Sequence, residues 1–125
     1  MGNHGPAYPT AVIASCDPGD ADKPLLGAKQ IAVGEGYSCA LLSGGTVECW
    51  GLNSEGQLGD GTTVSRACPA RVFGSVGMIG VTALSASGTV TCSVAPRGVY
   101  CWGAGILGDG GPAHESDKPV AVKSF

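Results

Sequence analysis

The sequence predicts an all-β fold made of two consecutive repeats, and three observations lead to it. Cys49-Trp50-Gly51 recurs as Cys101-Trp102-Gly103, and Leu58-Gly59-Asp60-Gly61 recurs as Leu107-Gly108-Asp109-Gly110. The 22 glycines and 8 prolines, set against 7 basic and 10 acidic residues, describe many turns and little helix. A period of about fifty residues is typical of stacked units such as propeller blades or solenoid turns.

We expect one repeat domain over residues 1–125, with a leading blade strand at 1–14, an inter-blade insertion at 15–29, repeat one at 30–74 and repeat two at 79–125. Pro9-Thr10-Ala11-Val12 is echoed by similar phrases that begin at Pro69 and at Pro119. Three such phrases flank two Cys-Trp-Gly cores, so Thr10–Ile13 is expected to be the last strand of a blade whose other strands are absent. A proline at the start of each phrase suits an edge strand, where no ladder donor is required.

The insertion contains a short acidic segment, Asp-Pro-Gly-Asp-Ala-Asp, in which Asp17, Asp20 and Asp22 lie close together. Three oxygen-bearing side chains in so short a stretch allow a calcium site. The spacing is not that of an EF-hand loop and no glutamate follows, so a solvated turn is the alternative. No other cofactor is expected.

In repeat one, strands are expected at Gln30–Val33, Tyr37–Leu42 and Thr46–Trp50, with Ser43–Gly45 as a tight hairpin loop. This loop places Leu41 opposite Val47 and Cys39 opposite Cys49. In repeat two, Ala95-Pro96-Arg97-Gly98 has a type I turn pattern. That turn sets Val94 opposite Val99 and Cys92 opposite Cys101, so two differently built hairpins present the same cysteine pair.

Directly opposed cysteines have β-carbons within the range that a disulfide requires. We therefore expect Cys39–Cys49 and Cys92–Cys101 bridges, with buried free thiols or a metal site as alternatives. No Cys-x-x-Cys spacing occurs, and the histidines lie far from these pairs in sequence. Cys16 and Cys68 each lie near an edge-strand phrase and form a candidate third bridge.

An even number of cysteines in a short chain favours an oxidising compartment, so we expect an extracellular or cell-surface protein, or a periplasmic one. Residues Met1 to Thr10 do not have the pattern of an export signal, which implies a removed leader or an engineered start if the protein is secreted. No apolar run has the length of about 20 residues that spans a bilayer.

Trp50 and Trp102 each follow a hairpin cysteine and so project from the other face of their sheets, together with Ala40 and Glu48 in repeat one. Because a tryptophan recurs in the repeat frame, we expect each to fill the gap between neighbouring blades. A ligand platform is the alternative.

The motifs resemble the regulator of chromosome condensation repeat family, especially its bacterial members, whose blades have a similar S-C-A-L-L-S-x-G-T-V-x-C-W-G-x-N-x-x-G-Q-L-G-D-G-T pattern. Repeat one matches this pattern over about thirty residues, whereas in repeat two the Asn-x-x-Gly-Gln stretch has shrunk to Ala104-Gly105-Ile106. The resemblance implies a β-propeller, usually a ring of about seven blades. Two repeats then form an incomplete propeller with open side faces.

Other function classes find little support in the sequence. The net charge is −3 and the basic residues are scattered, so no nucleic-acid footprint is present. The Leu-Gly-Asp-Gly motifs are expected to be structural turns, since no phosphate-loop lysine follows them. Neither the histidines nor the serines form a nucleophile and base pair, and we expect no enzyme activity.

The sequence therefore predicts a noncatalytic, extracellular structural or protein-binding module. Its open faces would be covered by copies of itself, in a ring or filament, or by neighbouring blades of a longer chain. The alternative is a regulatory propeller that acts on an enzyme or a small GTPase, as an inhibitor or in nucleotide exchange. That alternative comes from the resemblance alone.

Overall fold

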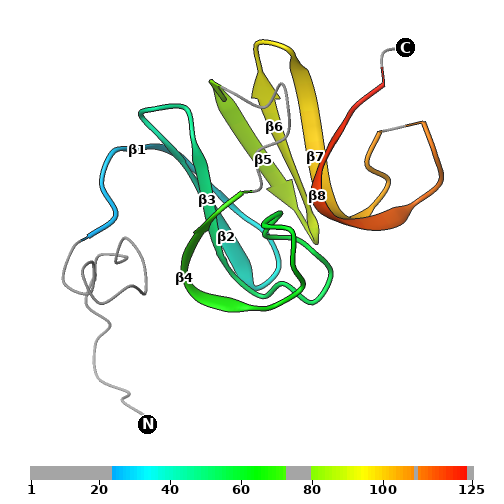
Figure 1. Cartoon of the computed structure of the whole chain (residues 1–125), viewed down its shortest axis with the longest axis horizontal. Coiled ribbons are helices and arrows are strands. Elements are labelled where there is room, and N and C mark those ends of the chain that lie inside the picture. Colours follow the sequence, from blue (N-terminus) through cyan, green and yellow to red (C-terminus); the bar gives the residue numbers. More distant parts are fainter. Residues whose placement is uncertain (1–23, 73–79, 109, 124–125) are drawn as a thin grey trace, which may run out of the picture.

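The computed structural model describes residues 24–72, 80–108 and 110–123. These residues form eight strands and no helix, in two four-stranded antiparallel sheets (Figure 1). The first sheet contains β1 (Ala28–Val33), β2 (Tyr37–Leu42), β3 (Val47–Gly51) and β4 (Arg66–Arg71). The second contains β5 (Ala83–Ser87), β6 (Val90–Ala95), β7 (Gly98–Gly105) and β8 (His114–Ala121). The predicted fold class, two blade-like repeats in an incomplete propeller, is confirmed.

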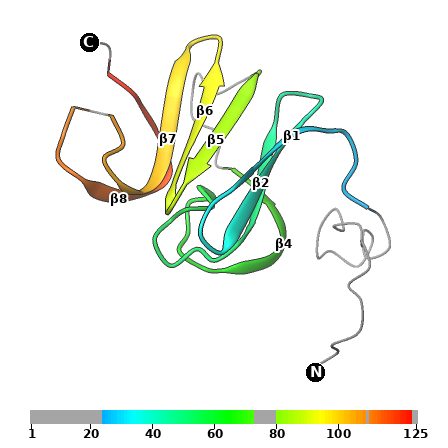
Figure 2. The same cartoon turned by 180° about the vertical axis from the view of Figure 1, so that it is seen from behind.

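Each sheet is a meander in which neighbours in sequence are neighbours in space, in the orders β1-β2-β3-β4 and β5-β6-β7-β8. The order of the second sheet can be followed in Figure 2. The predicted hairpin registers are confirmed, because Leu41 pairs with Val47 and Val94 pairs with Val99. The first hairpin needs a glycine at Gly45, where φ is +85° and the N–H donates to the Leu42 carbonyl at 2.9 Å.

Two details of the predicted layout differ in the structure. β1 begins at Ala28, inside the range expected for the insertion, so the first blade starts earlier than its hydrophobic run suggests. Pro69 and Pro119 do lie in edge strands, but within β4 and β8 and not at their starts. Pro69 lies where the β3–β4 register shifts between Cys49 and Gly51, and such an irregularity accommodates a residue without an N–H donor.

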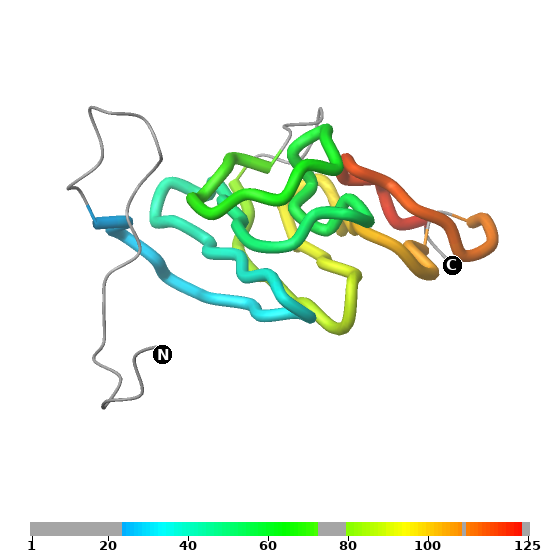
Figure 3. Tube along the Cα trace, turned by 90° about the horizontal axis from the view of Figure 1, so that it is seen from below, coloured from blue at the N-terminus to red at the C-terminus, as the bar shows by residue number. Residues whose placement is uncertain are grey.

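The two sheets lie beside one another, and the tube from β1 to β4 runs next to the tube from β5 to β8 (Figure 3). The core lies between them, because one buried cluster combines residues from both sheets. Each of these two sheets covers one face of the other, so the contact between the blades supplies the buried core. The expected leading strand Thr10–Ile13 and the Asp17, Asp20 and Asp22 segment lie outside the described residues.

Candidate functional site

Alternation along the strands gives each sheet two different faces. The disulfide face carries the paired cysteines, and the tryptophan face carries the Cys-Trp-Gly tryptophan. In the first sheet the disulfide face includes Gln30, Ala32, Cys39, Leu41, Val47, Cys49 and Ala70, and the tryptophan face includes Ile31, Val33, Ser38, Ala40, Glu48, Trp50 and Arg71. In the second sheet the disulfide face includes Ala83, Ser85, Cys92, Val94, Val99 and Cys101, and the tryptophan face includes Leu84, Ala86, Thr91, Ser93, Tyr100 and Trp102.

The disulfide face of the first sheet packs against the tryptophan face of the second. Leu41 and Val47 on one side, and Leu84 and Trp102 on the other, belong to the same buried cluster. Trp102 is 0% exposed. Burying apolar surface between the sheets stabilises their contact by roughly 25 cal/mol for each Å² removed from water.

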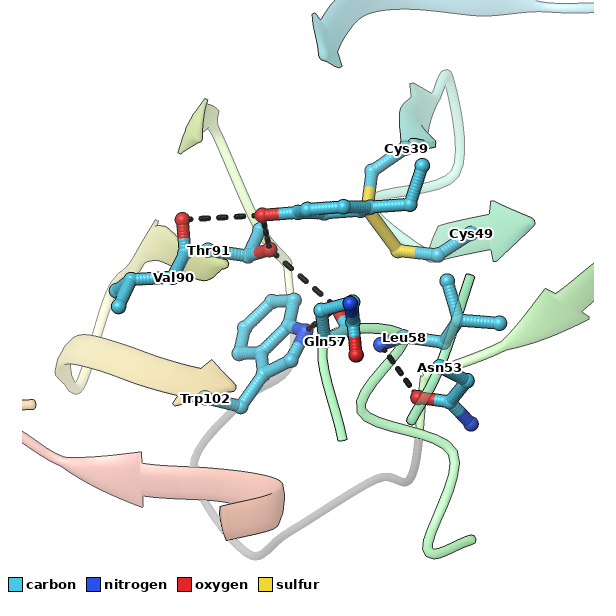
Figure 4. Close-up of a disulfide and its surroundings, with 9 residues drawn as sticks. Cys39, Cys49, Asn53, Gln57, Leu58, Val90, Thr91 and Trp102 are labelled. Carbon is cyan, nitrogen blue, oxygen red and sulfur yellow. Dashed lines mark hydrogen bonds between the residues drawn. A yellow bond between two sulfur atoms is a disulfide. The ribbon is translucent and has the colours of Figure 1, made fainter. Parts of the chain in front are cut away.

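Five polar groups join the blades at the centre of this contact (Figure 4). The Trp102 indole N–H donates to the Gln57 carbonyl at 2.9 Å. The Tyr37 hydroxyl donates to the Val90 carbonyl at 3.1 Å and accepts from Thr91 Oγ1 at 2.8 Å. Burial raises the pKa of Tyr37 and the hydrogen bond from Thr91 only partly opposes this, so the phenol keeps the proton that it donates. The indole and phenol are therefore satisfied inside an otherwise apolar interface.

A side-chain amide and several backbone groups extend the contact along its borders. The Gln30 amide both donates to the Leu84 carbonyl and accepts from the Leu84 N–H, at 2.9 Å each. Glu35 N–H donates to the Gly88 carbonyl at 2.8 Å, and Gly61 N–H donates to the Asp117 carbonyl at 2.8 Å. The blades are thus joined at both ends of the sheets as well as through the core.

The loop from Leu52 to Ser65, between β3 and β4, is held in place by Asn53. This side chain is 0% exposed. Its Nδ2 donates to the carbonyls of Thr62 at 2.9 Å and Val64 at 3.0 Å, and its Oδ1 accepts from Leu58 N–H at 3.0 Å. The loop in turn positions the Gln57 carbonyl that Trp102 binds, so we call residues 52–65 the clasp loop.

Asp60 fixes the second half of the clasp loop. Its Oδ1 accepts from the Thr62 N–H at 3.0 Å and hydroxyl at 2.7 Å, and its Oδ2 accepts from Arg66 Nε at 2.7 Å. Burial alone would raise the pKa of Asp60, but the hydrogen bonds from Thr62, Arg66 and Asn53 outweigh it and the pKa is lowered. The expected structural role of the Leu-Gly-Asp-Gly turn agrees with these bonds.

The lowered pKa predicts an acid-sensitive contribution of Asp60 to stability. The folded pKa lies below the unfolded one, so the stabilisation is complete above about pH 4 and is lost as pH falls through the folded pKa. We expect Asp60→Asn to be less stable than the parent near neutral pH, with the difference shrinking in acid. Urea unfolding midpoints for both proteins, measured across this range, check the prediction, and a constant difference would contradict it.

Sequence reasoning did not single out Asn53, Gln57 or Gln30 as residues that join the blades. The available signal was their position in the repeat frame: Asn53 and Gln57 belong to the stretch that repeat two lacks. The Asn53–Gln57 stretch of repeat one contacts the second sheet, because the Gln57 carbonyl accepts a hydrogen bond from Trp102. Repeat two has Ala104-Gly105-Ile106 in place of this stretch. Ile106 there is 76% exposed.

The cysteine pairs lie in the two central hairpins. Cys39 is bridged to Cys49, with Cα atoms 4.0 Å apart, and Cys92 is bridged to Cys101, with Cα atoms 4.1 Å apart. Cys68, on β4, is also disulfide-bonded. Its expected partner Cys16 lies outside the described residues.

The two hairpin disulfides differ in burial, which predicts different rates of reduction. Cys39 and Cys49 are both 0% exposed beneath the second blade, whereas on an open face Cys92 is only partly buried and its partner Cys101 is 4% exposed. In dilute protein we expect a mild phosphine to reduce Cys92–Cys101 well before Cys39–Cys49. Timed alkylation followed by peptide mass spectrometry measures the order. Equal rates would show that the first bridge is not shielded.

Trp50 occupies the same position in its sheet as Trp102, but its face has no neighbouring sheet among the described residues. Trp50 is half-buried on β3, while Ile31 is 62% exposed and Val33 is 64% exposed. Glu48 lies on the same face, where burial raises its pKa and the nearby Arg71 charge partly opposes the rise. At the other end, Val94 and Val99 are exposed on the disulfide face of the second sheet.

Ser93 is the one described residue whose buried side-chain oxygen has no hydrogen-bond partner. Its counterpart in the first sheet is Ala40. An unpaired buried hydroxyl costs about 1 kcal/mol or more, so we expect Ser93→Ala to stabilise the fold by roughly that amount. A thermal melt followed by circular dichroism checks this, with Ser85→Ala, on the exposed edge strand β5, as a neutral control. A lower melting temperature would contradict it.

Within the described ranges no cluster of three or more His, Cys, Asp or Glu side chains could hold a metal ion. No helix in the same ranges is long and apolar enough to cross a membrane.

Two sequence models of the regulator of chromosome condensation (RCC1) repeat match the chain, at residues 28–57 and 45–94. Together they span residues 28–94, which is more than half of the 125 residues. The chain is 37% identical over 99 residues to the ultraviolet-B receptor UVR8 of Arabidopsis thaliana, covering 76% of this chain and 22% of the receptor. It is 33% identical over 75 residues to Ras guanine nucleotide exchange factor C of Dictyostelium discoideum, covering 60% of this chain and 5% of that protein.

Two solved structures have a fold similar to that of this chain. Human WBSCR16 superposes with a TM-score of 0.69 at 22% identity, over 77% of this chain and 25% of that one. Prp20p of Saccharomyces cerevisiae, studied with Gsp1p and histones, superposes with a TM-score of 0.62 at 26% identity, again over 77% of this chain and 25% of that one. The chain thus spans about a quarter or less of the length of these relatives.

Proposed function

The chain belongs to the regulator of chromosome condensation repeat family, and from that premise we propose that it is a noncatalytic structural and protein-binding module. It acts as two blades of a larger propeller, and protein covers both of its open faces. Either copies of the chain or further blades of a longer protein supply that cover.

The difference between two equivalent tryptophans carries this proposal. Trp102 is 0% exposed because a neighbouring blade covers its face. Trp50 has the same place in its repeat, yet Ile31 and Val33 beside it remain more than half exposed. Large exposed apolar side chains that gather on one face of a small protein are typical of an interaction site.

Two measurements on the protein at micromolar concentration under oxidising conditions test the proposal. The first is light scattering after size exclusion, and the second is the binding of a dye that fluoresces on apolar surface. We expect either a mass above that of the 12.3 kDa chain or strong dye binding. A sharp monomer that melts cooperatively and binds no dye would overturn it, since its faces would then be closed.

An extracellular, cell-surface or periplasmic location forms part of the proposal. It is supported by the Cys39–Cys49 and Cys92–Cys101 bridges, because disulfides persist in oxidising compartments. Mass spectrometry of alkylated, non-reduced protein from its native source tests it. Six alkylated thiols would place the protein in a reducing compartment.

A regulatory role on an enzyme or a small GTPase is the second candidate. It is favoured by the likeness of the chain to two proteins, a Ras guanine nucleotide exchange factor and a protein studied for its binding to Gsp1p. The residues that match are those of the blade scaffold. A nucleotide-exchange assay on a Ras-type GTPase decides it, and release of bound nucleotide at an unchanged rate would remove the exchange variant of this candidate.

A further inference from the structure

We propose that the two open faces of this chain bind each other across copies, so that the tryptophan face of one copy packs on the disulfide face of the next. The inference rests on the proposed function and deepens it by naming a second copy as the partner. The contact between the two blades inside the molecule already shows how a disulfide face and a tryptophan face fit together.

The open disulfide face keeps the apolar pattern of the covered one. In the first sheet Leu41 pairs with Val47, and both are buried against the second blade. In the second sheet Val94 pairs with Val99 at the same register position, and both are exposed. The open surface therefore carries aliphatic side chains at the same register positions as the surface that a tryptophan face already covers.

The open tryptophan face keeps the pattern of its covered counterpart as well. Ile31 stands where the second sheet has Leu84, and Trp50 stands where it has Trp102. Ser38 stands where the second sheet has Thr91, so a hydroxyl lies beside each tryptophan. The shared pattern means that one copy carries both halves of the contact.

One position departs from this pattern. Glu48 stands where the second sheet has Tyr100, and it pairs across the strand with Arg71. Burying that pair under a second copy has an electrostatic cost that the internal contact does not have. On the other side of Glu48 the face continues with Ala40 and Ile31, which are apolar.

Contact between copies lacks some of the hydrogen bonds that join the two blades within one copy. Ala83 stands where the first sheet has Gln30, and Ala104-Gly105-Ile106 replaces the stretch that contains Gln57. Contact between copies is therefore mainly apolar and weaker than contact between the blades. Because the two faces differ, association is head-to-tail and produces a ring or an open row of copies.

Two exposed positions allow each face to be blocked without disturbing the core. Ile31→Glu places a charge on the tryptophan face and Val94→Glu places one on the disulfide face, at side chains 62% and 43% exposed. Val64→Glu, at a side chain that is 58% exposed in the clasp loop and on neither face, is the matched control. Circular dichroism establishes that all three variants fold.

Sedimentation of these proteins at matched micromolar concentrations tests the pairing. We expect the parent and Val64→Glu to assemble, and Ile31→Glu and Val94→Glu each to be monomeric. An equimolar mixture of the two blocked variants restores association, limited to dimers of roughly twice the monomer mass, because each variant retains the face that the other has lost.

The outcomes separate this inference from the proposed function. If the parent binds the apolar-surface dye but remains monomeric, the faces are open and a second copy is not their partner. If one blocked variant still assembles alone, a face binds its own equivalent and the head-to-tail pairing is wrong. If the parent is a closed monomer that binds no dye, the proposed function fails as well.

Reduction of Cys92–Cys101 gives an independent readout at the proposed contact. The bridge lies on the open disulfide face, so docking of a second copy would shield it. We expect its reduction rate to fall at least about threefold as protein concentration rises through the association range, with no such change in Val94→Glu. A rate independent of concentration in an assembled parent would show that this face is not the one covered.

Discussion

Trp102→Ala is expected to destabilise the protein far more than Trp50→Ala, although the two residues share one place in the repeat. Trp102 is 0% exposed, lies against the covered disulfide face and donates to the Gln57 carbonyl. Removing a buried tryptophan costs about 3–5 kcal/mol in lost burial and cavity formation. Trp50 is half-buried on an open face, and its removal should cost about 1–2 kcal/mol.

Chemical denaturation followed by far-ultraviolet circular dichroism measures both variants in dilute protein. Trp102→Phe serves as an intermediate control, because it keeps most of the apolar volume and leaves the Gln57 carbonyl without its indole donor. It should cost about 1–3 kcal/mol. Similar midpoints for Trp50→Ala and Trp102→Ala would contradict the view that only one tryptophan lies between blades.

Asn53→Ala is expected to be the most damaging change in the clasp loop, at about 3 kcal/mol, because several buried backbone groups lose their partner together. The Leu58 N–H and the Thr62 and Val64 carbonyls all bond to this one side chain. Ser54→Ala, at the exposed neighbouring position, is the matched control. The free energy of unfolding from urea titration measures the difference, and a loss below that of the control would sink the argument.

Asn53→Asp adds a second test of the same network. The aspartate keeps an acceptor for the Leu58 N–H but removes the donors and places a second carboxyl beside Asp60, where Asn53 Nδ2 now lies 3.2 Å from Oδ1. Like charges that close disfavour ionisation of both groups. Relative to the parent, Asn53→Asp should therefore lose less stability in mild acid than near neutral pH.

The hairpins could be predicted from the sequence because their determinants are local. Gly45 supplies the positive φ of the first turn, and the turn then fixes every pair along the hairpin, Cys39 with Cys49 included. The contact between blades was harder to predict, since Gln30 and Leu84 are 54 residues apart in the chain and no local rule pairs them. Comparison of the two repeats indicated that the tryptophans lie between blades. It did not indicate which backbone carbonyl accepts the hydrogen bond of the Trp102 indole.

The site could be predicted only as far as the repeat frame carries information. The frame identified Trp102 through its recurrence with Trp50, whereas Asn53 occurs once and has no counterpart to draw notice. The exact starts of the edge strands also depended on tertiary structure, because the register shift that admits Pro69 into β4 forms only when β3 is beside it. Residues that recur in both repeats could be recognised from the sequence, whereas the role of a residue that occurs once could be recognised only in the folded structure.

The amide of Gln30 has one more consequence. β5 pairs with β6 alone, so the other edge of that strand presents unused donors and acceptors, and such an edge is a template for aggregation. By bonding both the N–H and the carbonyl of Leu84, Gln30 covers these two groups as a neighbouring strand would, while adding no backbone of its own. One side chain from the first blade thus shortens the stretch of β5 edge at which another strand could pair.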